Sequence, residues 1–164
     1  LEDLLRKMTK NIRSLGERKQ TAILAHQVID AQCVLNLTGR SDDPTKLKGE
    51  SVDIDEMEAR RLWPLVSLAC SYQVGMSYLF GKYEMALQYA EKKKDTDEKY
   101  LHGFREFSRW VRCAYVFYDG LASLALSRTN LDPKLTQRSQ DAIDTMKTWA
   151  KLAPWNFEHK LELL

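Results

Sequence analysis

The feature that most constrains this chain is a short corner between two apolar helical segments, within residues 78–91. The sequence there is YLFGKYEMALQYAE. It predicts one helix that ends near Phe80, a tight corner at Gly81, and a second helix that begins at once. Ala86 and Ala90 lie one turn apart on the second helix, and their small side chains allow the two helices to approach closely. Hairpins of this kind stack into arrays that hold partners and usually do no chemistry.

The composition is that of a soluble globular domain. The 164 residues are enough for one domain with a hydrophobic core, 44% of them are apolar and 29% are charged. The formal net charge is only +2, which does not favour nucleic acid as a partner. We therefore treat residues 1–164 as a single helical domain.

Nothing in the chain predicts a membrane span or a secretory leader. No apolar run approaches the roughly 20 residues that cross a bilayer, and the first residues lack the basic and apolar regions of a signal peptide. The sequence does not begin with Met, so we expect a fragment of a longer polypeptide. Cys33, Cys70 and Cys113 are widely spaced in apolar helical contexts, which predicts reduced, buried thiols in a cytoplasmic protein rather than metal ligands or catalytic groups.

Further helices are predicted along the whole chain, and no strand. The expected helices cover residues 1–15, 17–37, 64–80, 82–94, 100–127 and 133–152, with a short one from Asp53 or Asp55 and a last one from about residue 156. Gly16 is expected to interrupt the chain between the first two. Residues 39–53 form the only long loop, and the charged run 92–99 is expected to be a connector. The expected fold is all-α, built from antiparallel helix pairs.

Several blocks of residues, in this order, resemble one family. They are QCVLNLTG at 32–39, DP-x-x-L-x-GE at 43–50, YLFGKY at 78–83, FYDGLA at 117–122, and Trp149 followed by APWNF-x-HK at 153–160. The family is the tetratricopeptide-like helical-repeat region of very large signalling proteins. In these proteins a protein-kinase-like domain and a predicted signal-transduction ATPase of the AAA type precede the repeats, and GAF or PAS sensors with a histidine-kinase or cyclase output domain often follow them.

The resemblance implies an all-helical linker without catalytic residues, metal or cofactor of its own. Cys70, Gln73 and Ser77 stand where the consensus tetratricopeptide repeat has Trp, Leu and Tyr, so the array is expected to be irregular. The implied function is a scaffold that mediates protein–protein or interdomain contacts in the cytoplasm. Self-association of the fragment is expected too, because terminal repeats lose their stacking neighbours.

The candidate partner-binding residues are three arginines and a tryptophan. Arg105, Arg109 and Arg112 fall on one face of the expected helix 100–127, where they could grip a phosphate or an acidic partner segment. Alternatively, they pair with carboxylates of a neighbouring helix, such as those of Glu84, Glu91 and Glu98. Trp155 belongs to a set of aromatic residues that form either the core between long helices or an apolar groove for a partner helix.

Other functions remain open as alternatives. A basic stripe at residues 6–13 suits a membrane surface, a partner helix or an upstream part of the same polypeptide. A small-ligand or enzyme module on a helical bundle would need polar groups that converge in a pocket, and no tight constellation is present in the sequence. A nucleic-acid binder would use the arginine stripes, and its binding would fall steeply with salt.

Overall fold

The computed structural model describes residues 1–17, 21–49, 52–102 and 109–164, and in these ranges the chain is all-α. Its only β-type pairing there is an isolated bridge between Lys48 and Asp53. The helices are α1 (Glu2–Glu17), α2 (Thr21–Leu37), α3 (Ile54–Ala59), α4 (Trp63–Leu79), α5 (Tyr83–Tyr100), α6 (Arg109–Ser127), α7 (Pro133–Leu152) and α8 (Pro154–Leu161).

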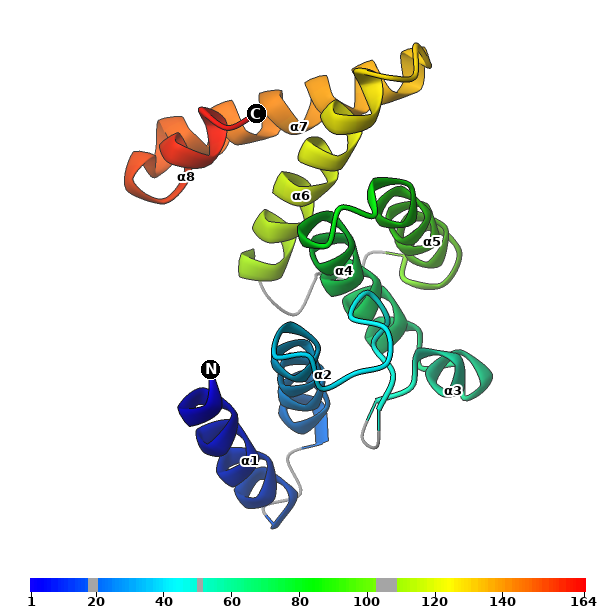
Figure 1. Cartoon of the computed structure of the whole chain (residues 1–164), viewed down its shortest axis with the longest axis vertical. Coiled ribbons are helices and arrows are strands. Elements are labelled where there is room, and N and C mark those ends of the chain that lie inside the picture. The colour runs from blue at the N-terminus through cyan, green and yellow to red at the C-terminus, as the bar shows by residue number, and fades with distance from the viewer. Residues whose placement is uncertain (18–20, 50–51, 103–108) are drawn as a thin grey trace.

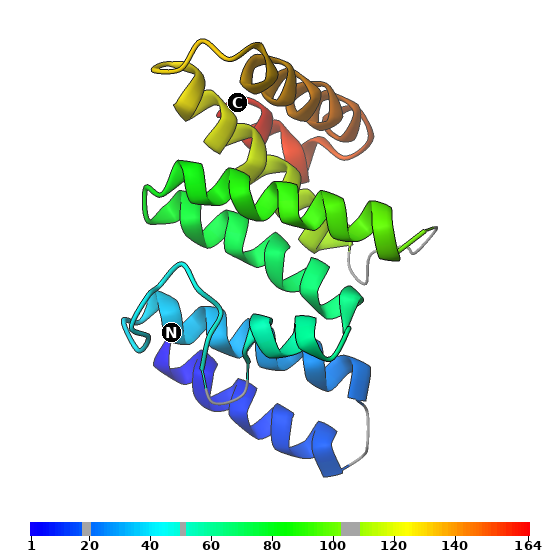
Figure 2. The same cartoon turned by 90° about the vertical axis from the view of Figure 1, so that its right-hand side faces the viewer.

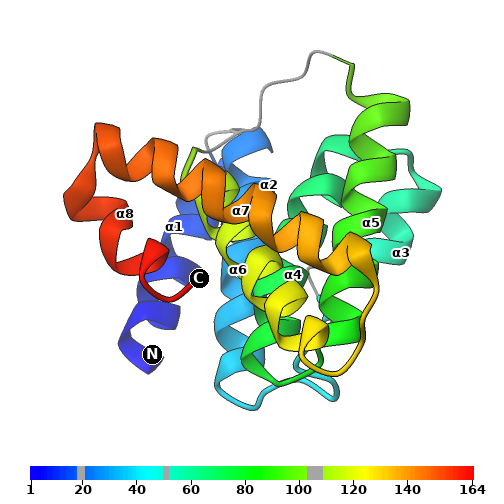
Figure 3. The same cartoon turned by 90° about the horizontal axis from the view of Figure 1, so that it is seen from above.

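The helices form an elongated stack in chain order (Figures 1 and 2). Helices α1 and α2 lie side by side at one end, the α4–α5 pair lies in the middle, and α6 with α7 opens as a V at the other end. Helix α4 is central, because it packs against α5, α6, α3 and α2. Seen from above, α7 crosses α6 and leads into α8, which folds back along α7 (Figure 3).

The corner between α4 and α5 confirms the expected hairpin. Gly81 has a φ of +69°, a backbone conformation that favours glycine, and the amide of Lys82 donates to the carbonyl of Ser77 at 2.8 Å. Ala86 and Ala90 are fully buried and pack in one cluster with residues of α4 and α6. Their size therefore sets the close approach of the central helices.

Helix starts also follow the sequence signals. The side chain of Asp53 accepts hydrogen bonds from the backbone of Asp55 and Glu56, as an N-cap does. Asp132 caps α7 in the same way, with Pro133 in the first turn. Pro64 lies in the first turn of α4, which confirms the expected break before it.

Three local expectations are wrong. Residues 92–99 are not a connector, because α5 continues to Tyr100. The expected start of a new helix at residue 100 is wrong for the same reason. Leu101 is the C-cap of α5, and the described part of the next helix begins at Arg109. Gly16 does not interrupt a helix either, since α1 runs to Glu17.

The charged run is helical because one of its lysines is buried. Lys93 is 3% exposed, and its Nζ donates to Asp97 Oδ2 at 2.6 Å and to Ser67 Oγ of α4 at 3.1 Å. Lys92 forms an ion pair with Glu58 at 2.6 Å. These contacts hold the last turns of α5 against α3 and α4, so a pattern that is typical of a solvated linker is part of the packed structure.

The loop that follows α2 folds back on that helix. Leu47 and Val52 are buried in the main core cluster. Asn36, buried on α2, donates its amide to the carbonyls of Pro44 at 3.0 Å and Lys46 at 2.8 Å, and accepts from Gln32. We call this set of hydrogen bonds the Asn36 cluster. It joins two of the blocks noted in the sequence, because Asn36 of the first binds backbone carbonyls of the second.

Candidate protein-binding groove

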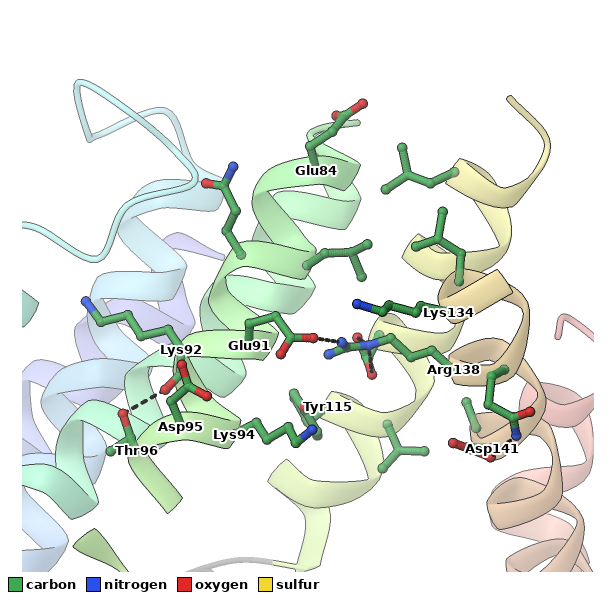
Figure 4. Close-up of a pocket in the computed structure, with 18 of the residues that line it drawn as sticks. Glu84, Glu91, Lys92, Lys94, Asp95, Thr96, Tyr115, Lys134, Arg138 and Asp141 are labelled. Atoms are coloured by element: carbon green, nitrogen blue, oxygen red, sulfur yellow. Dashed lines mark hydrogen bonds and ion pairs between the residues drawn. The ribbon is translucent and has the colours of Figure 1, made fainter. Parts of the chain in front are cut away.

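A groove opens between α5 and α7, with α6 as its floor (Figure 4). Its volume is about 1570 Å³. Charged side chains occur on both walls, whereas the apolar part of the lining includes the residues Trp63, Leu87, Tyr100, Tyr115, Val116, Leu126, Leu135 and Ala142. The groove is thus a mixed surface, in which apolar side chains from the floor and from both walls lie among charged ones.

The position of the floor depends on close helix contacts. A Cβ added at Gly120 would lie 2.6 Å from the Cβ of Ala142 on α7 and 2.9 Å from Leu164 Cδ2. A Cβ at Gly75 of α4 would lie 3.0 Å from the ring of Tyr118. At Gly120 a larger residue would force a shift of the neighbouring helix, and at Gly75 the Tyr118 ring would have to move by a few tenths of an ångström. Gly75 and Gly120 therefore hold α6 in register with the helices on both sides.

Three charged side chains meet at the centre of the groove, and we call them the Arg138 cluster. Arg138 of α7 donates from Nε to both carboxylate oxygens of Asp119 on α6, at 2.8 and 2.9 Å. Its Nη1 donates to Glu91 of α5. The ion pair of Arg138 and Glu91 joins the two walls across the groove, as Figure 4 shows.

Burial shifts the titration of this cluster. It raises the pKa of Asp119 above the ordinary value of 3.8, although the charge and hydrogen bonds of Arg138 oppose the rise. Burial acts against the charge of Arg138 too, but the neighbouring Asp119 carboxylate outweighs it, so the pKa of Arg138 is raised and the guanidinium stays protonated. Burial also raises the pKa of Tyr115, which remains a neutral phenol.

Of the three candidate arginines of the sequence, the two that the structure describes, Arg109 and Arg112, do not line the groove. Arg105 lies outside the described residues. Arg109 is exposed at the start of α6, and the Cζ of Arg112 lies 6.0 Å from the centre of the Trp149 ring, at the α7–α8 side of the molecule. Among the described residues, neither Arg109 nor Arg112 forms an ion pair with Glu84, Glu91 or Glu98, and Glu91 pairs with Arg138 instead.

Trp155 is separate from the aromatic core. Trp149 packs against Phe157 with ring centres 5.5 Å apart, whereas Trp155 is 94% exposed at the start of α8. The core interpretation is therefore wrong for Trp155, and its role in partner binding stays a prediction. Phe117 is buried as expected, and Tyr118 packs between Phe117 and Tyr78.

Arg138 is the groove residue that the sequence did not indicate. It lies on α7, a helix rich in polar residues, and its two partners come from other helices. One signal was available: Asp119 interrupts the apolar face of α6, and a buried carboxylate needs a cation or several hydrogen-bond donors. That signal predicts a partner but not its position.

Two of the three cysteines lie in the hydrophobic core. Cys33 and Cys70 are buried, and burial raises the pKa of both thiols to about 12, so they stay protonated at neutral pH. Within the described ranges, no group of three or more His, Cys, Asp or Glu residues is placed to hold a metal ion. None of the helices described is both long and apolar enough to cross a bilayer.

Comparison with known proteins gives no match. Neither the family models nor the curated proteins nor the solved structures gave a match to this chain.

Proposed function

We propose that this chain is a non-catalytic, tetratricopeptide-like scaffold that binds a protein segment in the groove between α5 and α7. By its resemblance to helical-repeat linkers, it belongs to a cytoplasmic signal-transduction ATPase or kinase and mediates protein–protein or interdomain contacts. The observation that carries the proposal is the groove itself, which has helices as walls, an apolar floor and a charged centre.

The size of the groove favours a polypeptide over a small molecule. Pockets for small ligands usually enclose roughly 300–1,000 Å³ and bury most of the ligand. The groove here has about 1570 Å³ and is open along α5 and α7. A helix laid into such a groove places side chains from successive turns on the floor. Leu87 of α5 and Leu135 of α7 provide apolar contacts for those side chains.

The chemistry of the groove favours binding over catalysis. Nucleophilic catalysis needs a nucleophile within hydrogen-bond reach of a base. At the centre of this groove, Arg138 is bound to two carboxylates, an arrangement that positions charge and recognises a partner. The residue blocks of the family resemblance have structural roles as well, since Asn36 binds the loop and Gly120 permits the α6–α7 contact.

A photo-crosslinking experiment tests the proposal. A benzophenone amino acid is placed at Gln88 or Gln137 in the groove, or at Lys151 on α7 outside it, in the native full-length polypeptide. We expect both groove positions to crosslink to one and the same segment, identified by mass spectrometry, and Lys151 not to crosslink to it. Equal crosslinking at all three positions, or none at the groove, would contradict the proposal.

A further inference from the structure

A second, smaller cleft lies along one side of α1, and Arg40, which follows α2, forms its other side. Its volume is about 440 Å³. The lining residues on α1 recur every three or four positions from residue 2 to residue 13, so they form one face that is about 16 Å long. The cleft is therefore elongated. It lies at the opposite end of the helix stack from α7, as Figure 1 shows.

The cleft has a surplus of positive charge. Its charged lining consists of one carboxylate and four cations, namely Glu2, Arg6, Lys10, Arg13 and Arg40. Asp3 pairs with Arg6 and with Lys7 beside the cleft, and with these two included, five cations face two carboxylates. Even with Glu17, one turn beyond Arg13, the balance stays positive. The cleft is therefore complementary to negative charge.

Two of the four cations have no carboxylate of their own. Arg40 forms an ion pair with Glu2 at 2.5 Å, and Arg6 is bound by Asp3. In the part of the chain that the structure describes, Lys10 and Arg13 form no ion pair. They are three residues apart on α1 and share one face of the helix. One end of the cleft thus holds a carboxylate already, whereas the end at Lys10 and Arg13 offers two cations to an incoming group.

The packing of α1 argues against a membrane as the partner. Met8 is buried, and Leu5 and Ile12 pack with it against Ala31 and Val34 of α2. A helix that binds a bilayer surface inserts its apolar face among the lipids. This face of α1 belongs to the core of the protein, so the side that remains available is the basic one.

The layout of the cations favours a row of carboxylates over a single phosphate group or a nucleic acid. Arg6 and Arg13 are seven residues apart, about 10 Å along the helix, which is too far for one phosphate to contact both and Lys10 as well. No aromatic side chain is among the described residues that line the cleft, so it offers no platform for a base. Glu2 already places its carboxylate on Arg40, so the space accepts such a side chain.

We propose that this cleft binds an acidic segment of a protein partner, whose carboxylates lie along α1 and pair with Lys10 and Arg13. The guanidinium of Arg13 can hold one carboxylate by two parallel hydrogen bonds, and Lys10 binds a second one as a point charge. Acids that are three or four residues apart on a helix, or two apart on an extended segment, match the separation of two side chains one turn apart. The site goes beyond the proposed function, because it is separate from the groove.

A titration with acidic peptides tests the proposal. The probes are two fluorescein-labelled peptides of 16 residues, the length of α1, made of Glu and Ala. Glu alternates with Ala in one peptide and recurs every three or four positions in the other. We expect at least one of them to bind the chain, measured by fluorescence anisotropy, and the same peptides with Gln in place of Glu not to bind. No binding by either Glu peptide, or equal binding of the Gln versions, would overturn the proposal.

Charge variants test whether the peptide lies in the cleft. Lys10 and Arg13 are exposed, so Lys10→Gln/Arg13→Gln should keep the fold, which circular dichroism checks, and should weaken binding about tenfold. Glu2→Gln removes the carboxylate of the lining and should strengthen binding about twofold. The matched control is Arg128→Gln/Lys151→Gln, which removes the same charge outside the cleft and the groove and should leave the affinity nearly unchanged. Equal weakening by both double variants, or weaker binding by Glu2→Gln, would overturn the proposal.

Two further probes test the class of partner. Phosphatidylserine vesicles and a single-stranded oligonucleotide are titrated at the same salt concentration as the peptides. We expect both to bind more weakly than the better Glu peptide. Tighter binding of either one, lost in Lys10→Gln/Arg13→Gln, would overturn the choice of a protein partner. Crosslinking at Gln88 and Gln137 should not change in this variant, so a failure at the cleft leaves the proposed function of the groove intact.

Discussion

The loop region (α2 and residues 39–49) and the groove region (α5, α6 and α7) are both held by a polar cluster, but the clusters differ in charge. The Asn36 cluster is made of neutral amides and backbone carbonyls, with Gln32 and Asn36 almost fully buried. The Arg138 cluster is ionic and reaches the solvent at Glu91. The first connects segments that are neighbours in sequence, whereas the second connects three separate helices.

This difference indicates which region is structural and which can exchange partners. A neutral amide that binds backbone carbonyls in the interior has no competitor, because water does not reach it. An ion pair with one exposed member exchanges readily with other charges, and its net contribution to stability is small. We therefore expect the loop region to fix the fold and the groove region to provide the binding surface.

The largest expected effect is loss of the Asn36 cluster. Asn36→Ala removes the donor to two carbonyls and the acceptor of Gln32, so it should lower the free energy of unfolding by about 3 kcal/mol. Urea unfolding followed by circular dichroism measures this loss. The control is Asn11→Ala on the exposed face of α1, which should change stability very little. If both variants unfold like the wild type, the loop region is not the more rigid of the two.

A smaller effect is expected where α6 meets α7. Gly120→Ala places a methyl group 2.6 Å from the Cβ of Ala142, and the strain should cost about 2 kcal/mol and shift the groove walls apart. The same substitution at Gly16 of α1 meets no atom within 4 Å and should stabilise the helix by roughly 0.5 kcal/mol. Thermal unfolding of both variants checks whether stability falls for Gly120→Ala and rises for Gly16→Ala. Stabilisation by Gly120→Ala would show that the walls are less closely packed than the contact indicates.

The sequence predicts much of the fold because its signals are local. The corner at Gly81 and the start of α7 at Pro133 depend on neighbouring residues, and both are confirmed. The charged run 92–99 was misjudged because Lys93 is bound by Ser67, which is 26 residues away in the sequence. The carboxylate of Asp97 lies within the run, but a charge pattern cannot reveal that the hydroxyl of a distant residue completes the hydrogen bonding of a buried Lys93.

The centre of the groove could not be predicted for the same reason. Arg138 is 19 residues from Asp119 and 47 from Glu91, and no local pattern connects three helices. The arginines that the sequence singled out share one helix face, and this periodicity indicates only that they are neighbours. Which of several basic residues enters a groove depends on how the hairpins stack. That information lies in contacts such as the one at Gly120.

The smallest effect, and the sharpest test of the comparison, is the opposite pH dependence of two aspartates. In the loop region, the side chain and backbone of Thr45 donate to Asp43 at 2.6 and 3.0 Å, and the hydroxyl hydrogen bond in particular lowers the pKa of Asp43 below 3.8. Its stabilising contribution is complete above that value and is lost as the pH falls through the lowered pKa. Burial raises the pKa of Asp119 above 3.8, so its contribution is complete below that value and is lost as the pH rises through the raised pKa. The free energy of unfolding in urea is measured for the wild type, Asp43→Asn and Asp119→Asn from about pH 6 to about pH 3, and the gap is the difference between wild type and variant at each pH. On acidification, the gap should shrink for Asp43→Asn and grow for Asp119→Asn. If both gaps change in the same direction, the two regions do not differ in the way that their clusters indicate. Because each variant is compared with the wild type at the same pH, the general effect of acid on the other carboxylates cancels.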